Sequence, residues 1–327
     1  MPKILRYIYV VLAITSILFI SLIFITLFSK LQIPNQTIIV SPGDTLGTIS
    51  NKLNQRKLLK YPFVLKLYGT ISFKEKNIKS GEYLINDKKN IYQLLDDMVN
   101  GDIYYRNFRI KEGSRFNELI LKIRNAEMLV DDLSDNPESF LRNKFNIPFP
   151  YMEGLFAPET YFYKSGDLVS DILGRAYKAQ MSHLKTAWSG RSIGLPYKDK
   201  YELLILASIV EKEGNEKSKI ASVFLRRLLL GMKLQTDPTV IFAMGIAYNG
   251  NIKRKDLLME HPYNTYFING LPPGPISFPS KSSIATSSFL DDESYLYFVA
   301  KGDGTHYFSS SYEEHIRAVE KYQLKSK

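Results

Sequence analysis

The chain has 327 residues but contains no cysteine and only four histidines. The lack of cysteine excludes disulfides, thiolate nucleophiles and Cys-ligated metals together. The histidines have no His-Glu-x-x-His pattern and no short paired spacing, so we expect no metal site and no other cofactor. A Gly-x-Ser-x-Gly elbow, a P-loop and a dinucleotide fingerprint are also missing.

The net charge is +10, carried mainly by lysine, with no Arg/Lys cluster interleaved with aromatic residues. Nucleic acid is therefore not an expected partner, whereas anionic lipid headgroups or an acidic polymer would suit a basic surface. Hydrophobic residues make up 45% of the chain and aromatic residues 13%, as is typical of a packed globular protein. The length is enough for two domains.

Residues 7–29 carry no charge and consist mostly of Ile, Leu, Val and Phe, which is a run long enough to span a bilayer. Lys3 and Arg6 precede the run and favour a cytoplasmic tail at residues 1–6, with everything after Lys30 outside the cytoplasm. A cleaved signal peptide is the alternative. The run is longer than a typical signal-peptide core and no small-x-small site follows it, so we expect an uncleaved anchor.

A strand, a turn and a helix start are predicted twice. The first copy is Thr-Ile-Ile-Val-Ser-Pro-Gly-Asp-Thr-Leu at 37–46, with Asp44 or Thr45 as the helix cap, and the second is at 107–116. Aligning the two central glycines places one set of apolar residues on the other: Leu46 on Phe116, Ile49 on Leu119 and Leu53 on Ile123. Between the copies we expect a strand at 81–85 and a helix at 91–99, capped by Asn90 and closed by Gly101.

Residues 203–213 predict a helix that is apolar on nearly every face and ends in Glu211 and Glu213, with Gly214 and Asn215 stopping it. At about 100° per residue the two carboxylates point about 200° apart, so one cleft can hold only one of them. A carboxylate at the end of a buried helix either forms an ion pair, here with Lys212 or Lys217, or keeps its proton through a raised pKa. The second state is that of a general acid.

Five motifs follow one another in the chain. They are Glu-Gly-Leu-Phe-Ala-Pro-Glu-Thr-Tyr at 153–161, the helix at 203–213, Leu-Gln-Thr-Asp-Pro-Thr-Val-Ile at 234–241, Tyr-Asn-Thr-Tyr-Phe-Ile-Asn-Gly-Leu-Pro-Pro-Gly-Pro-Ile at 263–276, and an aromatic run with Gly-Asp-Gly and His306 near the end. Together they resemble the endolytic murein transglycosylase family of membrane-anchored enzymes, and the resemblance covers the whole chain. The Pro-Gly-Asp-Thr-Leu stretch also resembles LysM modules, which bind N-acetylglucosamine polymers, although the same residues make an ordinary turn.

The resemblance implies an α+β protein with a transmembrane helix at 7–29, a LysM-like βαβ-type module at 37–106 and a lytic transglycosylase catalytic domain at 107–327. Its substrate would be the peptidoglycan glycan strand, cut between N-acetylmuramic acid and N-acetylglucosamine. The muramic C6 hydroxyl attacks its own C1 and leaves a 1,6-anhydro end, so one carboxyl can act first as acid and then as base.

The resemblance assigns the catalytic role to Glu211, the first acid of its motif, and a raised pKa is expected for it. Substrate-contacting or orienting roles are expected for seven more residues: Glu153, Glu213, Gln235, Asp237, Tyr263, Asn264 and Tyr266. Each has a structural alternative, namely an ion pair or exposed acid for the glutamates, a loop for Gln235 and Asp237, and an aromatic core with a capping amide for the other three. His306 is expected to be structural. One departure is Phe-Pro-Ser at 278–280, where the family usually has Asn-Pro-Gly.

We therefore expect an enzyme anchored in the inner (plasma) membrane that cuts nascent glycan strands on the periplasmic, or extracytoplasmic, side and limits their length, with glycan polymerases as candidate partners. Two alternatives remain open at this point. One is a non-catalytic peptidoglycan-binding module, and the other is a muramidase with two carboxylates.

Overall fold

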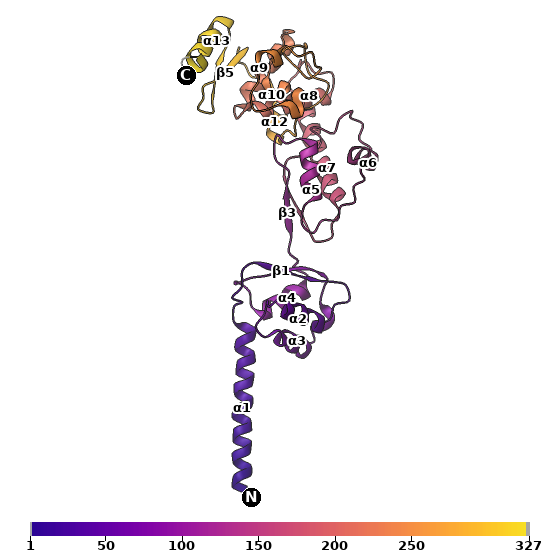
Figure 1. The fold of residues 1–327 in the computed structure, drawn as a ribbon, viewed down its shortest axis with the longest axis vertical. Helices are drawn as coiled ribbons and strands as arrows, with labels where there is room; N and C mark the ends of the chain where they lie inside the picture. Colours follow the sequence, from indigo (N-terminus) through magenta and orange to yellow (C-terminus); the bar gives the residue numbers. More distant parts are fainter. Residues whose placement is uncertain (1, 325–327) are drawn as a thin grey trace. The chain divides into compact units, whose positions relative to one another are not determined.

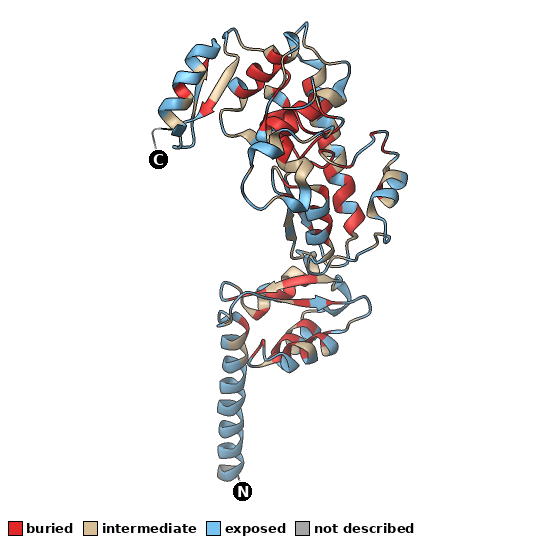
Figure 2. Ribbon diagram, turned by 45° about the horizontal axis from the view of Figure 1, so that its top comes forward, coloured by how far each residue is buried: buried red, intermediate tan, exposed pale blue. Residues whose placement is uncertain are grey.

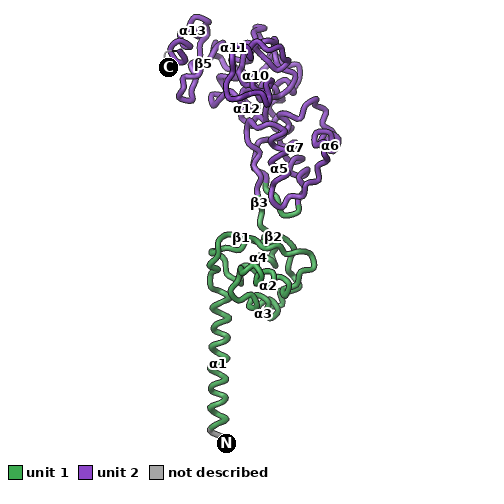
Figure 3. The backbone as a smooth tube through the Cα atoms, viewed as in Figure 1, with its two compact units in different colours: residues 1–106, 162–166 green, residues 107–161, 167–327 purple. Residues whose placement is uncertain are grey.

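The computed structural model describes residues 2–324 and divides the chain into two compact units (Figures 1 and 3). Unit 1 comprises Met1–Arg106 with Phe162–Gly166, and unit 2 comprises Asn107–Tyr161 with Asp167–Lys327. Among the described residues the strands pair into three two-stranded sheets, β1–β2, β3–β4 and β5–β6, and most of the other elements are helices. The expected α+β class is confirmed.

Unit 1 begins with helix α1, Pro2–Phe28, whose segment Ile4–Phe28 has the length and apolar composition needed to cross a membrane. A signal sequence would pass the same test. The helix is exposed along most of its length (Figure 2) and joins the rest of unit 1 only near its end. There Leu27 is buried, and Asn90 Nδ2 donates to Phe28 O at 3.3 Å.

The rest of unit 1 is a strand pair with helices. Strand β1, Gln36–Val40, runs antiparallel to β2, Gly81–Ile85, with Ile38 opposite Tyr83. The helices are α2 Leu46–Gln55, α3 Pro62–Ile71, the 3₁₀ turn η1 Glu75–Asn77 and α4 Ile91–Asn100. Thr45 caps α2, and Asn90 forms a capping box on α4, which Gly101 closes at φ 81°. These caps are as expected from the sequence.

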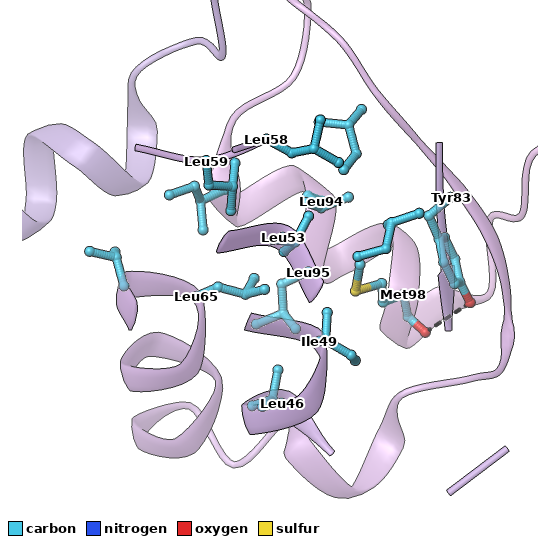
Figure 4. Packing of buried hydrophobic residues seen from close by; sticks show 14 of the residues in the cluster. Leu46, Ile49, Leu53, Leu58, Leu59, Leu65, Tyr83, Leu94, Leu95 and Met98 are labelled. Atoms are coloured by element: carbon cyan, nitrogen blue, oxygen red, sulfur yellow. Dashed lines mark hydrogen bonds between the residues drawn. The ribbon is translucent and has the colours of Figure 1, made fainter. Parts of the chain in front are cut away.

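The core of unit 1 is formed by residues of β1, β2, α2, α3 and α4 and of the segment after α2 (Figure 4). Leu46, Ile49 and Leu53 of α2 are fully buried, as are Leu94 and Leu95 of α4. Each buried leucine or isoleucine contributes about 1.5–3 kcal/mol relative to an exposed one. The buried face of α2 is therefore the face that the repeated pattern predicted.

Unit 2 repeats this local plan and then becomes mainly helical. Strand β3, Arg106–Arg109, is followed by Gly113 at φ 68° and by α5, Phe116–Arg124, whose buried residues include Phe116, Leu119 and Ile123. The predicted strand–turn–helix unit is thus present at both positions. The remaining elements are α6 Pro137–Phe145, β4 Thr160–Tyr163, α7 Val169–Ser189, α8 Lys200–Glu213, α9 Lys217–Leu229, α10 Asp237–Met244, η2 Gly245–Ala247, α11 Arg254–Leu257, α12 Lys281–Thr286, β5 Tyr297–Ala300, β6 His306–Ser309, α13 Tyr312–Val319 and the π-helical turn η3 Glu320–Leu324.

Helix α8 is the centre of unit 2. Asp199 caps it, accepting from the backbone N–H groups of Tyr201 and Glu202, and every residue at 203–210 is buried. Helices α7, α9 and α12 pack around it, and these segments form the main buried region of unit 2 (Figure 2). A helix enclosed in this way holds its last turn, with Glu211 and Glu213, in fixed directions.

Candidate active site

A cavity of about 380 Å³ lies beside the C-terminal end of α8. One wall carries polar side chains from α8 and from the loop that leads into α10, and another comes from β5, β6 and α13. The lining residues are Glu213, Arg227, Leu234, Gln235, Asp237, Tyr266, Phe298, Val299, Ala300, His306, His315, Val319 and Gln323. Four of the eight predicted site residues (Glu213, Gln235, Asp237 and Tyr266) therefore meet in one cavity.

Glu213 is the carboxylate of α8 that reaches this cavity. Thr236 Oγ1 donates a hydrogen bond to Glu213 Oε1. Burial raises the pKa of the Glu213 carboxyl to about 7, with a further upward push from Asp237, while Thr236 and Arg227 oppose the shift. A carboxyl with this pKa is partly protonated at neutral pH and is able to donate its proton.

The loop before α10 is held in an unusual conformation. Gln235 has φ 51°, in the left-handed region that non-glycine residues seldom adopt. Two hydrogen bonds to Thr265 support it, from Gln235 N to Thr265 O at 3.2 Å and from Thr236 N to Thr265 Oγ1 at 3.0 Å. A strained backbone conformation that hydrogen bonds hold in place is often found at functional sites.

Asp237 and Tyr266 form a polar pair on the cavity wall. Tyr266 Oη donates to Asp237 Oδ1 at 2.6 Å, and burial, followed by the Asp237 carboxylate, raises the pKa of the Tyr266 hydroxyl above its ordinary value. The phenol therefore stays protonated, with its one O–H engaged by Asp237, and it offers a hydroxyl oxygen that can still accept a hydrogen bond and an aromatic face. Both features suit a sugar ring with its hydroxyl and amide groups.

Glu211 lies on another face of α8 and does not line the cavity. Ser280 N, Ser280 Oγ and Ser283 Oγ donate to Glu211 Oε2 at 2.9, 2.6 and 2.5 Å, and Lys217 Nζ donates to both carboxylate oxygens at 3.0 Å. Burial alone would raise the pKa of this carboxyl, but the donors from Ser280, Ser283 and Lys217 together lower it. The expected raised pKa of Glu211 is therefore wrong, because the ion-pair alternative with Lys217 is the one that forms.

Ser280, the last residue of the Phe-Pro-Ser departure, acts as a helix cap. Its φ is −66°, and its side chain accepts from Ser283 N at the start of α12. No positive φ is needed at this position, so a serine in place of glycine costs nothing in backbone strain. The same residue ties α12 to the Glu211 carboxylate.

Glu153 also lies away from the cavity. Both carboxylate oxygens accept from Phe116 N at 3.1 Å, so Glu153 takes the place of a cap on α5, where Arg115 makes no side-chain cap bond. Burial raises the pKa of Glu153 to about 7 against the lowering effect of this hydrogen bond. The Glu153 carboxylate is thus engaged with the backbone at the start of α5, and its role in substrate contact stays a prediction.

Replacing Glu153 by Gln is expected to make stability less dependent on pH. An acid whose folded pKa is raised stabilises the fold below its unfolded pKa of 4.5, and this contribution is lost as pH rises to about 7. The loss amounts to about 3 kcal/mol. The measurement is urea unfolding of the full chain in detergent, followed by the fluorescence of Trp188. The free energy of unfolding of Glu153→Gln, relative to that of the unsubstituted chain, should be higher at pH 8 than at pH 5. Equal differences at the two pH values would contradict it.

Tyr263 and Asn264 belong to the protein interior. The Tyr263 ring is 8% exposed and packs against Phe242 with ring centroids 4.7 Å apart. Asn264 Nδ2 donates to Leu257 O at 3.0 Å and Met259 O at 2.8 Å, and its Oδ1 accepts from Tyr266 N. These contacts agree with the alternative of an aromatic core with a capping amide, and sugar contact by the two side chains stays a prediction.

His306 was not expected at the site, yet it forms part of the cavity wall. Its ring Nδ1 lies 3.1 Å from Glu216 Oε2, and its backbone N donates to the same oxygen at 2.6 Å. The two residues are 90 positions apart, so no local spacing could have indicated the pair. Within residues 2–324 no group of three or more His, Asp or Glu side chains is arranged to hold a metal ion.

Comparison with known proteins places this geometry in context. A model of the YceG-like family matches residues 38–321. A protein of Bacillus subtilis (strain 168) named endolytic murein transglycosylase is 30% identical over 312 residues, which cover 86% of this chain and 83% of that protein.

A Streptococcus pneumoniae (strain D39) protein of the same name is 33% identical over 177 residues, so the match spans 51% of this chain and 32% of that longer protein. A crystal structure of a yceG-like protein from Listeria monocytogenes aligns with a TM-score of 0.50 and 27% identity, covering 88% of this chain and 99% of that one.

Proposed function

Because the chain belongs to the YceG-like family, we propose that it is an endolytic murein transglycosylase, the activity named for its relatives in Bacillus subtilis and Streptococcus pneumoniae. Its substrate is the glycan strand of peptidoglycan, and the bond cut is that between N-acetylmuramic acid and N-acetylglucosamine. The products are a 1,6-anhydro-muramyl end and a free N-acetylglucosamine end.

The proposal rests on one observation above the others, the half-buried carboxyl of Glu213 on the cavity wall with a pKa of about 7. Glu213 in its protonated form donates to the glycosidic oxygen as the C1–O bond breaks. The C6 hydroxyl of the same muramic residue then closes on C1, so the protein needs to supply no nucleophile and no bound water. A general acid placed in this way accelerates such a step about 10²–10⁴-fold.

Glu213 is therefore proposed in the role that the family resemblance assigned to Glu211. The Glu211 carboxylate is 6% exposed, is held by four hydrogen-bond donors that favour its ionised form, and does not line the cavity. Glu211 ties the last turn of α8 to α9 and α12, and Glu213 projects from that turn.

Gln235, Asp237 and Tyr266 are proposed to bind the sugar rings next to the cleaved bond. Gln235 lies in the loop before α10, Asp237 begins α10 and Tyr266 belongs to the 263–276 motif, and all three line the cavity with Glu213. Amide, carboxylate and phenol groups can together bind N-acetyl and hydroxyl groups, and the Tyr266 ring offers an apolar face for a pyranose.

The location proposed for the enzyme is the plasma, or inner, membrane, with α1 as a single-pass anchor and both units on the extracytoplasmic or periplasmic side. Lys3 and Arg6 before the apolar segment favour this orientation. Newly polymerised glycan lies at this surface, so the cuts would end strand growth beside the glycan polymerases. A LysM-like role for residues 37–106, in positioning or glycan contact, remains part of the proposal.

The muramidase alternative has a specific observation in its favour. Asp237 lines the same cavity as Glu213, and a hydrolase needs two carboxylates about 5–5.5 Å or 6.5–9.5 Å apart. The two reactions differ in their products, because hydrolysis leaves a reducing muramic end and transglycosylation leaves an anhydro end. The products therefore decide between them.

Long glycan strands incubated with the full-length protein in detergent are expected to be cut internally. The shorter strands that result should carry 1,6-anhydro-muramyl ends, detected by mass spectrometry. Reducing ends instead would establish hydrolysis, with Asp237 as the second carboxylate to be examined. Binding of glycan without any new ends, also after reconstitution into vesicles, would contradict the enzymatic proposal and favour the non-catalytic module.

A further inference from the structure

The wall of the cavity that β5, β6 and α13 contribute carries a histidine that the mechanism above does not use. His306 is the first residue of β6, its side chain is 10% exposed, and the rings of Phe298 and Phe308 flank it with centroids 5.4 and 6.1 Å away. Strand β5 in turn packs on α9 through Phe298 and Phe224, whose centroids are 5.6 Å apart. The imidazole is therefore fixed in position and does not move freely as a surface side chain would.

Glu216 determines how the imidazole carries its proton. A carboxylate oxygen only accepts hydrogen bonds, so the 3.1 Å contact between His306 Nδ1 and Glu216 Oε2 requires the proton on Nδ1. The neutral ring then carries its lone pair on Nε2. No hydrogen bond within residues 2–324 occupies Nε2, and His306 lines the cavity.

The ring also lies close to the end of α8. A Cβ on Gly214 would lie 3.0 Å from His306 Cε1 and 3.9 Å from Nε2, and Gly214 directly follows Glu213. Only a glycine at this position, with φ 155°, allows the imidazole to approach the backbone so closely. His306 and Glu213 thus line one cavity, and the imidazole lies next to the end of α8 that carries Glu213.

We propose that His306, oriented by Glu216, is the base of the proposed transglycosylase reaction, taking the proton of the muramic C6 hydroxyl while Glu213 serves as the acid. The inference rests on the proposed function. It divides between two side chains the work that a single carboxyl would otherwise do in turn, and it makes Glu216 a positioning residue.

The step balances without any further reactant. The Glu213 proton moves to the glycosidic oxygen and the C1–O4 bond breaks, leaving the N-acetylglucosamine hydroxyl. The C6 oxygen forms its bond to C1, and its proton moves to His306 Nε2. The enzyme then holds a Glu213 carboxylate and a His306 imidazolium. Transfer of one proton from the imidazolium to the carboxylate through water restores both groups.

The test uses the full-length protein in detergent and measures anhydro ends formed per unit time. His306→Ala is expected to lower the rate about 10²-fold. Added imidazole should raise the rate of this variant at least tenfold, and substituted imidazoles of increasing basicity should raise the rate progressively more. A control is His183→Ala, which removes a histidine that also faces a carboxylate, Glu159 at 3.5 Å, but lies on α7 away from the cavity. It should stay within about twofold of the unsubstituted protein.

A second variant keeps the histidine in place. Glu216→Gln can still accept from Nδ1 but loses the charge that supports imidazolium formation, so kcat should fall about tenfold with KM unchanged. The ¹⁵N shifts of His306 should show the Nδ1–H form in the unsubstituted protein and a mixture of forms in the variant. This variant also serves if His306→Ala does not fold.

Several results would overturn the inference. One is His306→Ala working within threefold of the unsubstituted rate, which would mean that Glu213 alone transfers both protons. Another is a folded His306→Ala whose loss imidazole does not relieve, which would make His306 a structural residue. An unchanged kcat in Glu216→Gln is the third. In each case the unsubstituted protein still forms anhydro ends, whereas failure of the proposed function would show as their absence from the unsubstituted protein itself.

Discussion

Glu213→Gln is expected to lower the formation of anhydro ends about 10²–10⁴-fold, the usual effect of removing a general acid. Glutamine has nearly the same shape and can still accept the hydrogen bond from Thr236 Oγ1, so the fold should be retained. It has no proton to give to the glycosidic oxygen. The measurement is quantitative mass spectrometry of glycan products, with the affinity for glycan determined in parallel and expected to change little.

The matched comparison is Glu211→Gln, two residues earlier on the same helix. This variant removes the ion pair with Lys217 and is expected to reduce stability, but at a temperature where it is folded it should keep most of the activity. If Glu211→Gln abolished activity in a folded protein while Glu213→Gln retained it, the acid would be Glu211 as the family resemblance implied.

The pH dependence of the rate provides an independent check on Glu213. Because the acid must be protonated, kcat/KM should fall as pH rises through about 7, the pKa of Glu213 in the free protein. Glu211, whose pKa is lowered, would already be ionised throughout this range. Activity that stays constant from pH 6 to pH 9 would contradict Glu213 as the acid.

Lys217→Met is expected to destabilise unit 2 by about 3–5 kcal/mol, since removing one partner of a buried ion pair leaves the other charge uncompensated. The Lys217 and Glu211 side chains are 18% and 6% exposed. The measurement is urea unfolding followed by Trp188, the only tryptophan, which lies on α7 of unit 2. Because the folded pKa of Glu211 is lowered, its contribution is present above the ordinary value of 4.5 and is lost as pH falls below it.

The control for this experiment is Lys212→Met. Lys212 directly follows Glu211 on α8 and is exposed. Among the residues described, its Nζ donates only to Gly113 O at 3.2 Å. A change of about 0.5 kcal/mol or less is expected for a surface lysine of this kind. Equal effects of the two substitutions would mean that the Glu211–Lys217 pair makes no special contribution to stability.

Local patterns in the sequence were sufficient for much of the fold. The apolar residues 7–29, the caps Thr45 and Asn90, the closing Gly101 and the buried helix at 203–213 all correspond to observed elements. In each case the physical cause lies within a few residues, in helical periodicity, capping hydrogen bonds or the conformational freedom of glycine. The repeated strand–turn–helix was found for the same reason.

The sequence alone therefore determined that this protein has an apolar segment able to cross a membrane, an α+β architecture and a buried helix with two acids near its end. The two acids point in different directions, so only one of them can face a given cleft. Which acid faces the cavity was decided by tertiary structure. Ser280 and Ser283 are the cap and a first-turn residue of α12, some 70 residues beyond Glu211, and they hold that carboxylate ionised. His306 reaches Glu216 across 90 residues. The pKa of a carboxyl depends on every charge and donor within a few ångströms, and these neighbours are set by packing between distant segments.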